Sequence, residues 1–140
     1  MYAAVARRLV GCLVAAVVAS QIVAQPVLPE IDLQHFLPVA SPALSVGTFQ
    51  AIRRSTGVTR AFFLVGTDKF SLRWLERHRN QLIELQAVGL VVEASNPSDY
   101  RALEQVAVGL TIRPVSGDLF AEHLNIHFYP ALVTAEGVFP

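Results

Sequence analysis

Apolar residues form a continuous run at residues 61–65 and dominate a second segment at residues 88–94. A run of this length without alternation is typical of a strand that is buried on both faces. The segment over residues 71–87 instead repeats its apolar residues every three or four positions, which predicts an amphipathic helix. Its stripe consists of Leu75, His78, Leu82 and Leu85, with Trp74 beside it.

The same alternation continues toward the end of the chain. Asn96 and Pro97 predict the start of a second helix, as its N-cap and first helical residue, and this helix is expected to end near Gly109. Residues 110–115 predict a shorter strand near an edge of the sheet, because Pro114 interrupts it. The chain then predicts, in order, a short helix over 119–124, a strand after Pro130, a turn at 135–137 and an antiparallel strand at 138–139.

Strands that alternate with helices form β-α-β units, which build a parallel sheet with helices on both faces. We therefore expect an α/β fold with a mostly parallel central sheet flanked by helices. Tyr129-Pro130 refines this expectation. A helix, a short turn and an X-Pro dipeptide that opens a strand is the arrangement seen before the third strand of thioredoxin-like domains, where the X-Pro bond is cis. That context favours a cis bond, and an ordinary trans proline remains the alternative.

The N-terminal segment, residues 1–24, has the pattern of a secretory signal peptide. Arg7 and Arg8 precede an apolar stretch at residues 9–19, and Ala24 offers a small residue at the cleavage position. The apolar stretch is shorter than the roughly 20 residues that span a bilayer. We therefore favour a cleaved leader, and hence a periplasmic protein, over an uncleaved membrane anchor.

Residues 25–58 are rich in proline near their start and predict an extended arm or linker, which leaves residues 59–140 as the folded domain. The formal net charge of the whole chain is 0, and loss of the leader removes two arginines and no acid, which changes the net charge to −2. Neither value supports bulk attraction to nucleic acid or to an anionic membrane.

Cys12 is the only cysteine, and it lies within the predicted leader. Cleavage would leave a chain without a disulfide, a thiolate metal site or thiol redox chemistry. The segment 9–12 superficially resembles a lipoprotein cleavage box, but apolar residues continue after Cys12, whereas such a box closes the apolar region.

Few residues suggest chemistry. The loop at residues 66–71 follows the first buried strand, where open α/β sheets place ligand sites, but it has no cysteine and no phosphate-binding motif. Asp68 has two interpretations, a helix cap and a functional carboxylate, and a cap is the commoner role. His123 and His127 are four residues apart, but the predicted helix ends between them, and His78 is best explained as a packed side chain. We expect no cofactor and no metal.

The chain resembles a family of small exported proteins encoded in the transfer modules of integrating conjugative elements. The matching segments, in order, are residues 61–66, 73–75, 87–92, 114–118 and 128–135. More distantly, the helix-turn-Tyr-Pro-strand segment is similar to TrbC-type pilus-assembly proteins of F-like conjugation systems, which are regarded as thioredoxin-like periplasmic domains without a redox pair. The resemblance implies a thioredoxin-like fold without Cys-x-x-Cys, and it carries over no catalytic residue.

The resemblance also implies a function, namely a non-catalytic periplasmic component of a type IV secretion or mating-pair formation apparatus that binds other transfer proteins. In redox relatives a groove between the loop and the X-Pro turn holds an extended peptide, and we expect the partner there. The candidate groove residues are Asp68, Lys69, Phe70, Trp74, Tyr129 and Pro130. Alanine at Tyr129 or Lys69 is expected to weaken partner binding without unfolding the domain.

Two rival functions remain. A thiol oxidoreductase or isomerase of the same fold is disfavoured, because the predicted mature chain has no cysteine. A membrane-anchored structural subunit would need an uncleaved leader. No small-molecule substrate is expected, and export together with neutral charge disfavours a role on nucleic acid.

Overall fold

The computed structural model describes residues 32–140 of the chain. The predicted signal peptide, its cleavage site, Cys12 and the start of the proline-rich arm lie outside the described residues. The described residues belong to one compact unit, a mixed α/β domain with three α-helices.

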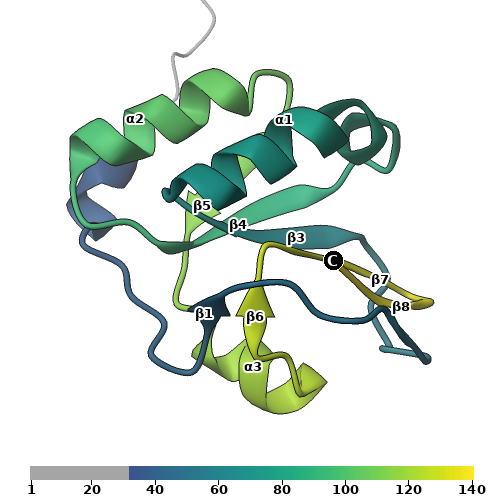
Figure 1. The fold of residues 1–140 in the computed structure, drawn as a ribbon. Coiled ribbons are helices and arrows are strands. Elements are labelled where there is room, and N and C mark those ends of the chain that lie inside the picture. The colour runs from purple at the N-terminus through teal and green to yellow at the C-terminus, as the bar shows by residue number, and fades with distance from the viewer. Residues whose placement is uncertain (1–31) are drawn as a thin grey trace, which may run out of the picture. The chain divides into compact units, whose positions relative to one another are not determined.

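A six-stranded sheet runs through the unit with the strand order β2-β8-β7-β3-β4-β5 (Figure 1). Its strands are β2 (Ile52–Arg53), β3 (Phe62–Gly66), β4 (Val88–Glu93), β5 (Thr111–Pro114), β7 (Ala131–Thr134) and β8 (Gly137–Phe139). The two apolar segments form β3 and β4 near the middle of the sheet, and β5 forms an edge, which confirms these three predictions. A separate parallel pair joins β1 (Ser45–Val46) to β6 (Phe128–Tyr129).

The sheet is mixed, so the expectation of a mostly parallel sheet was wrong. β3, β4 and β5 are parallel, whereas β7 runs antiparallel to β3, β8 to β7 and β2 to β8. The reason lies in α3 (Asp118–Leu124), which has only 7 residues and spans about 10 Å. This helix is too short to carry the chain back across the sheet. The chain therefore enters β7 from the end at which β3 leaves, and the two strands are antiparallel.

The helices begin where the sequence predicted. In α1 (Lys69–Glu84) and α2 (Pro97–Val106), the N-caps are Asp68 and Asn96, and Pro97 occupies the first helical position. Each cap side chain accepts a hydrogen bond from the backbone N–H three residues later, which satisfies one of the free donors of the first turn. α1 ends earlier than residue 87, because Gln86 adopts a left-handed backbone with φ 51°.

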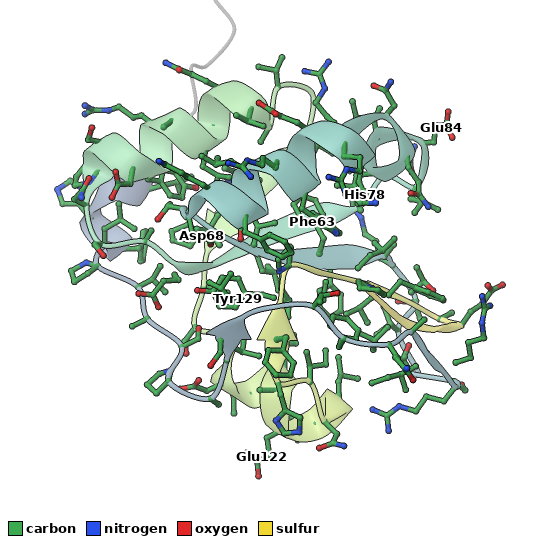
Figure 2. All side chains as sticks on the ribbon, in the orientation of Figure 1. Phe63, Asp68, His78, Glu84, Glu122 and Tyr129 are labelled. Carbon is green, nitrogen blue, oxygen red and sulfur yellow. The ribbon has the colours of Figure 1, made fainter. Side chains whose placement is uncertain are left out.

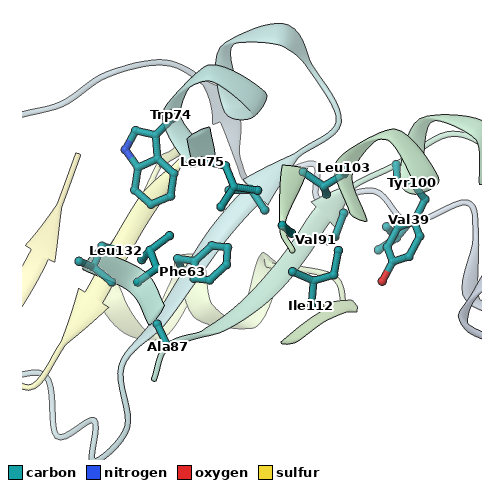
Figure 3. Close-up of a cluster of buried hydrophobic side chains, with 14 residues drawn as sticks. Val39, Phe63, Trp74, Leu75, Ala87, Val91, Tyr100, Leu103, Ile112 and Leu132 are labelled. Atoms are coloured by element: carbon teal, nitrogen blue, oxygen red, sulfur yellow. The ribbon is translucent and has the colours of Figure 1, made fainter. Parts of the chain in front are cut away.

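Each face of the sheet carries its own apolar cluster, since successive side chains of a strand point to opposite faces. α1 and α2 pack together on one face, over a cluster that includes Phe63, Leu75, Val91 and Leu103 (Figure 3). α3 packs on the other face, where Leu64, Val92, Val133 and Val138 form the second cluster. Helices thus lie on both faces of the sheet, as the β-α-β pattern predicted.

The described part of the predicted arm packs on the sheet. Residues 39–48, which we call the strap, begin with a two-way backbone pairing of Val39 with Ala94, with N–O distances of 3.0 and 2.9 Å. Ser41 and Leu44 are buried, and Leu44 belongs to the second apolar cluster. The strap therefore contributes to the core of the described unit.

Candidate functional site

Asp68 in the predicted groove is a structural helix cap. Its Oδ2 accepts from the backbone N–H of Ser71 at 2.9 Å, and its Oδ1 accepts from the Ser71 hydroxyl at 2.7 Å. The same hydroxyl oxygen accepts from the backbone N–H of Gly66 at 3.0 Å. These bonds hold the loop after β3 against the first turn of α1. The helix-cap interpretation of Asp68 is confirmed.

Tyr129 lies in the core rather than on a groove surface. Its side chain is only 5% exposed, and it packs so closely on Gly66 that a Cβ atom added there would lie 2.6 Å from the tyrosine ring. Asp68 and Tyr129 lie close together at the N-terminal end of α1 (Figure 2). Burial, and to a smaller extent the negative charges of Asp68 and Glu93, raise the pKa of Tyr129 to about 12. The phenol is therefore neutral throughout the physiological pH range.

The backbone beside the proline is occupied by the protein itself. The Tyr129-Pro130 bond is cis, as the sequence context favoured. The strap runs alongside it as β1: Ser45 N–H donates to the His127 carbonyl at 3.0 Å, and Gly47 N–H donates to the Tyr129 carbonyl at 3.1 Å. A segment of the predicted arm therefore occupies the backbone that holds an extended peptide in redox relatives, and partner contact at this groove stays a prediction.

Three of the predicted groove residues do share one surface hollow. Phe70, Trp74 and Pro130 line a space of about 250 Å³, together with Gly47 and Thr48 of the strap. Phe70 is 45% exposed, whereas Trp74 and Pro130 are buried and form the floor. Lys69 is exposed at the first residue of α1. The structure thus separates the six residues: three line a surface hollow, Asp68 is a helix cap, Tyr129 is buried, and Lys69 is exposed.

A second hollow of about 400 Å³ continues from the first along α1, and the two share Trp74, His78 and Pro140. We call the combined space the α1 groove. Its second half is lined on the sheet side by Arg53, Leu132 and Phe139, which the sequence analysis did not single out. Leu132 and Phe139 are partners in the β7-β8 pairing, so their common face follows once the hairpin is known. The sequence predicted the hairpin but not which face it presents to α1.

His78 lies in this groove as a packed side chain, as predicted. Its ring stands 4.7 Å from the Trp74 ring, centroid to centroid, and its Nδ1 bonds the Trp74 carbonyl oxygen at 2.8 Å. That carbonyl is an acceptor, so Nδ1 is the protonated ring nitrogen. α3 ends between His123 and His127, at Leu124. Within residues 32–140, no three histidine, cysteine or acidic side chains gather in a way that suits a metal ion.

The fold and the site define a mixed α/β domain with a groove beside α1 that is lined by both apolar and polar side chains. The chain belongs to a family of proteins of unknown function (DUF2859), whose family model matches residues 14–138. No curated protein and no solved structure matches the chain. Over the part that the structure describes, no helix is both long and apolar enough to cross a membrane.

Proposed function

We propose that this protein is a thioredoxin-like domain without a redox pair, exported to the periplasm, where it serves a conjugative transfer apparatus by binding other transfer proteins. The proposal joins the sequence resemblance described above to the character of the candidate site. It assigns the protein no reaction and no cofactor.

The central strands support the thioredoxin-like part of the proposal. Parallel β3 and β4 are joined by α1, and antiparallel β7 and β8 continue the sheet on the other side of β3. A cis proline, Pro130, stands directly before β7 and beside the loop that follows β3. The α2-β5 unit adds one further parallel strand at the β4 edge. The loop after β3, residues 66–71, has the sequence Gly-Thr-Asp-Lys-Phe-Ser, so it has no cysteine where redox relatives carry Cys-x-x-Cys.

The observation that carries the binding role is the groove beside α1. Its floor contains Trp74 and Leu132, and Phe70 and Leu85 at its ends are 45% and 41% exposed. Asp68, the one carboxylate among the predicted groove residues, is committed to the helix cap, and Glu136 is the carboxylate side chain of the lining. Exposed apolar side chains around a hollow are the mark of a protein-binding surface. The site is therefore suited to recognition.

A mating experiment tests this proposal. The gene is deleted from a donor strain that carries the transfer module, and transfer frequency is measured with and without complementation by the wild-type chain and by Cys12→Ser. We expect the deletion to lower transfer strongly and both versions to restore it, because the proposed role needs no thiol. Undiminished transfer after deletion would contradict the proposed function. Failure of Cys12→Ser alone, with normal amounts of protein, would contradict its thiol-independent character.

A further inference from the structure

α1 carries two stripes of side chains, and the core uses the whole of one stripe but only Trp74 of the other. Ser71, Leu75 and Leu82 are buried against the sheet. A second stripe, at spacings of three and four residues that place its members on one side of the helix, lines the α1 groove. Its members are Phe70, Trp74, His78, Gln81 and Leu85. The second stripe begins and ends with exposed apolar side chains.

Within residues 32–140, no helix lies over the sheet beside this stripe. On the face that carries α1, the strands β2, β8 and β7 present Arg53, Phe139 and Leu132 to the groove. Among residues 32–140, α1 and α2 are the α-helices of this face, and both lie over the β3-β4-β5 half of the sheet (Figure 1). Half of this face therefore remains without a covering layer.

The uncovered half matches the width of one helix. Neighbouring strands lie about 4.8 Å apart, so β2, β8 and β7 together are about 10 Å across between the outer two. An α-helix with its side chains is about 10 Å in diameter. A single helix laid alongside α1 would complete the layer, with the second stripe of α1 as one wall and Leu132 and Phe139 as the floor.

The groove also shows which polar groups its occupant must carry. Trp74 is 94% buried, and its Nε1–H has no hydrogen-bond partner within the described part of the chain; Figure 3 shows this nitrogen on the side of the ring turned away from Phe63 and Leu75. A buried donor of this kind favours an acceptor in the occupant. Arg53 and Arg77 add two cations to the lining, against Glu136 as the one carboxylate side chain there. The two arginine side chains favour acidic groups on the occupant.

We infer that the α1 groove binds an amphipathic helix of a partner protein, with an apolar stripe facing Trp74, Leu132 and Phe139 and acidic residues along its flanks. This inference deepens the proposed function, since it rests on the protein acting by protein binding, and it specifies the binding mode and the chemistry of the partner. The occupied X-Pro backbone has no part in it.

Selection from a display library of helix-forming peptides, each about 20 residues or 30 Å long, tests the inference on the full chain purified from expressing cells. Binding of the selected peptides is then followed by the fluorescence of Trp74, which is the only tryptophan of the chain, with peptides that lack tryptophan. We expect the selected peptides to share an apolar stripe with acidic flanks and to shift the Trp74 emission at saturation.

Two variants locate the site. Leu85→Glu places a charge in the groove, just past the end of α1, and should weaken binding about tenfold or more through repulsion and lost apolar contact. Val108→Glu is the matched control, since Val108 is 61% exposed and lies just past the end of α2, and it should bind like the wild type. Circular dichroism of both variants verifies that each is folded.

A charge exchange tests the acidic character. Arg77→Glu should weaken binding of the acidic peptides and strengthen binding of the same peptides with lysine in place of glutamate. Equal binding by wild type and folded Leu85→Glu, selection of basic or stripe-free peptides, or failure to select any peptide would each overturn the inference. None of these outcomes depends on transfer frequency, so failure of this inference and failure of the proposed function are distinguishable.

Discussion

The sequence predicted that Tyr129 contacts a partner protein, whereas the structure places its side chain in the core. Its ring packs on Gly66 with 5% of the side chain exposed, so it stabilises the fold instead of offering a contact surface. Tyr129→Ala should therefore lower the free energy of unfolding by about 3–5 kcal/mol, the usual cost of truncating a buried aromatic side chain. This corrects the expectation that the substitution leaves the domain folded.

Urea denaturation measures this effect, with Tyr129→Phe as the control. The phenylalanine variant keeps the ring and should retain most of the stability, because only the hydroxyl is removed. A folded Tyr129→Ala variant with wild-type stability would mean that the ring is not part of the core.

Tyr100 and Tyr129 predict a stability change at high pH. Burial raises the pKa of each phenol to about 12, with neighbouring carboxylates acting in the same direction. Between the ordinary pKa of about 10 and the folded value, the folded chain keeps protons that the unfolded chain loses. Their contribution to stability is therefore complete below pH 10 and is lost as the pH rises through 12.

The measurement is the urea midpoint as a function of pH over this window. The wild type should lose stability more steeply than the variant that carries both Tyr100→Phe and Tyr129→Phe, which has no phenol to titrate at these positions. Parallel pH profiles for the two proteins would show that the phenols are not coupled to folding.

At the scale of elements, the strap depends on one buried hydroxyl. Ser41 Oγ donates to the Val92 carbonyl at 2.7 Å and accepts from the Gly117 N–H at 2.7 Å, and the residue is only 3% exposed. Ser41→Ala leaves both backbone groups without this partner, which should lower the free energy of unfolding by about 1–3 kcal/mol.

Ser45→Ala is the matched control, since Ser45 is exposed and pairs with His127 through its backbone N–H alone. Thermal unfolding compares the two variants. Equal stability of Ser41→Ala and Ser45→Ala would contradict the role assigned to the Ser41 hydroxyl in holding the strap.

The elements also show what local sequence predicts well and what it does not. Asn96 and Asp68 predicted the starts of their helices, because a cap acts on the N–H groups of its own first turn. The apolar segments at β3 and β4 likewise predicted buried strands. The direction of β7 depended on the length of α3, which is a property of the whole connection. The position of the strap depended on Ser41 reaching Val92 and Gly117, far along the chain.

On the scale of the whole molecule, the candidate site was predicted in part. Phe70, Trp74 and Pro130 line the α1 groove, as their assignment to one surface predicted. Tyr129 and Asp68 were assigned to the same surface from their positions in the chain, and burial and capping remove them from it. The sequence analysis did not assign Arg53 and Phe139 to the candidate site. The groove forms where β2 and β8 lie beside α1, and a local sequence pattern does not predict contacts between elements so far apart in the chain.

The face of the sheet that carries α1 has two unlike halves. Over β3, β4 and β5 the face is covered by α1 and α2, and over β7, β8 and β2 the residues that the structure describes leave it open, with apolar and charged side chains on its lining. The proposed binding role needs such a surface, and the proposed helix of a transfer protein would complete it. The central claim is therefore that a partner helix occupies the α1 groove in cells that carry out transfer.

Site-specific photocrosslinking in mating donor cells tests this claim most directly. A photoreactive amino acid is placed at position 85 in the α1 groove, or at position 108 as the exposed control, in a strain where each version still supports transfer. The account predicts adducts with a transfer protein at position 85 and none at position 108, with the crosslinked partner segment mapping to an acidic amphipathic helix. Ongoing transfer without an adduct at position 85, or with equal adducts at both positions, would contradict it.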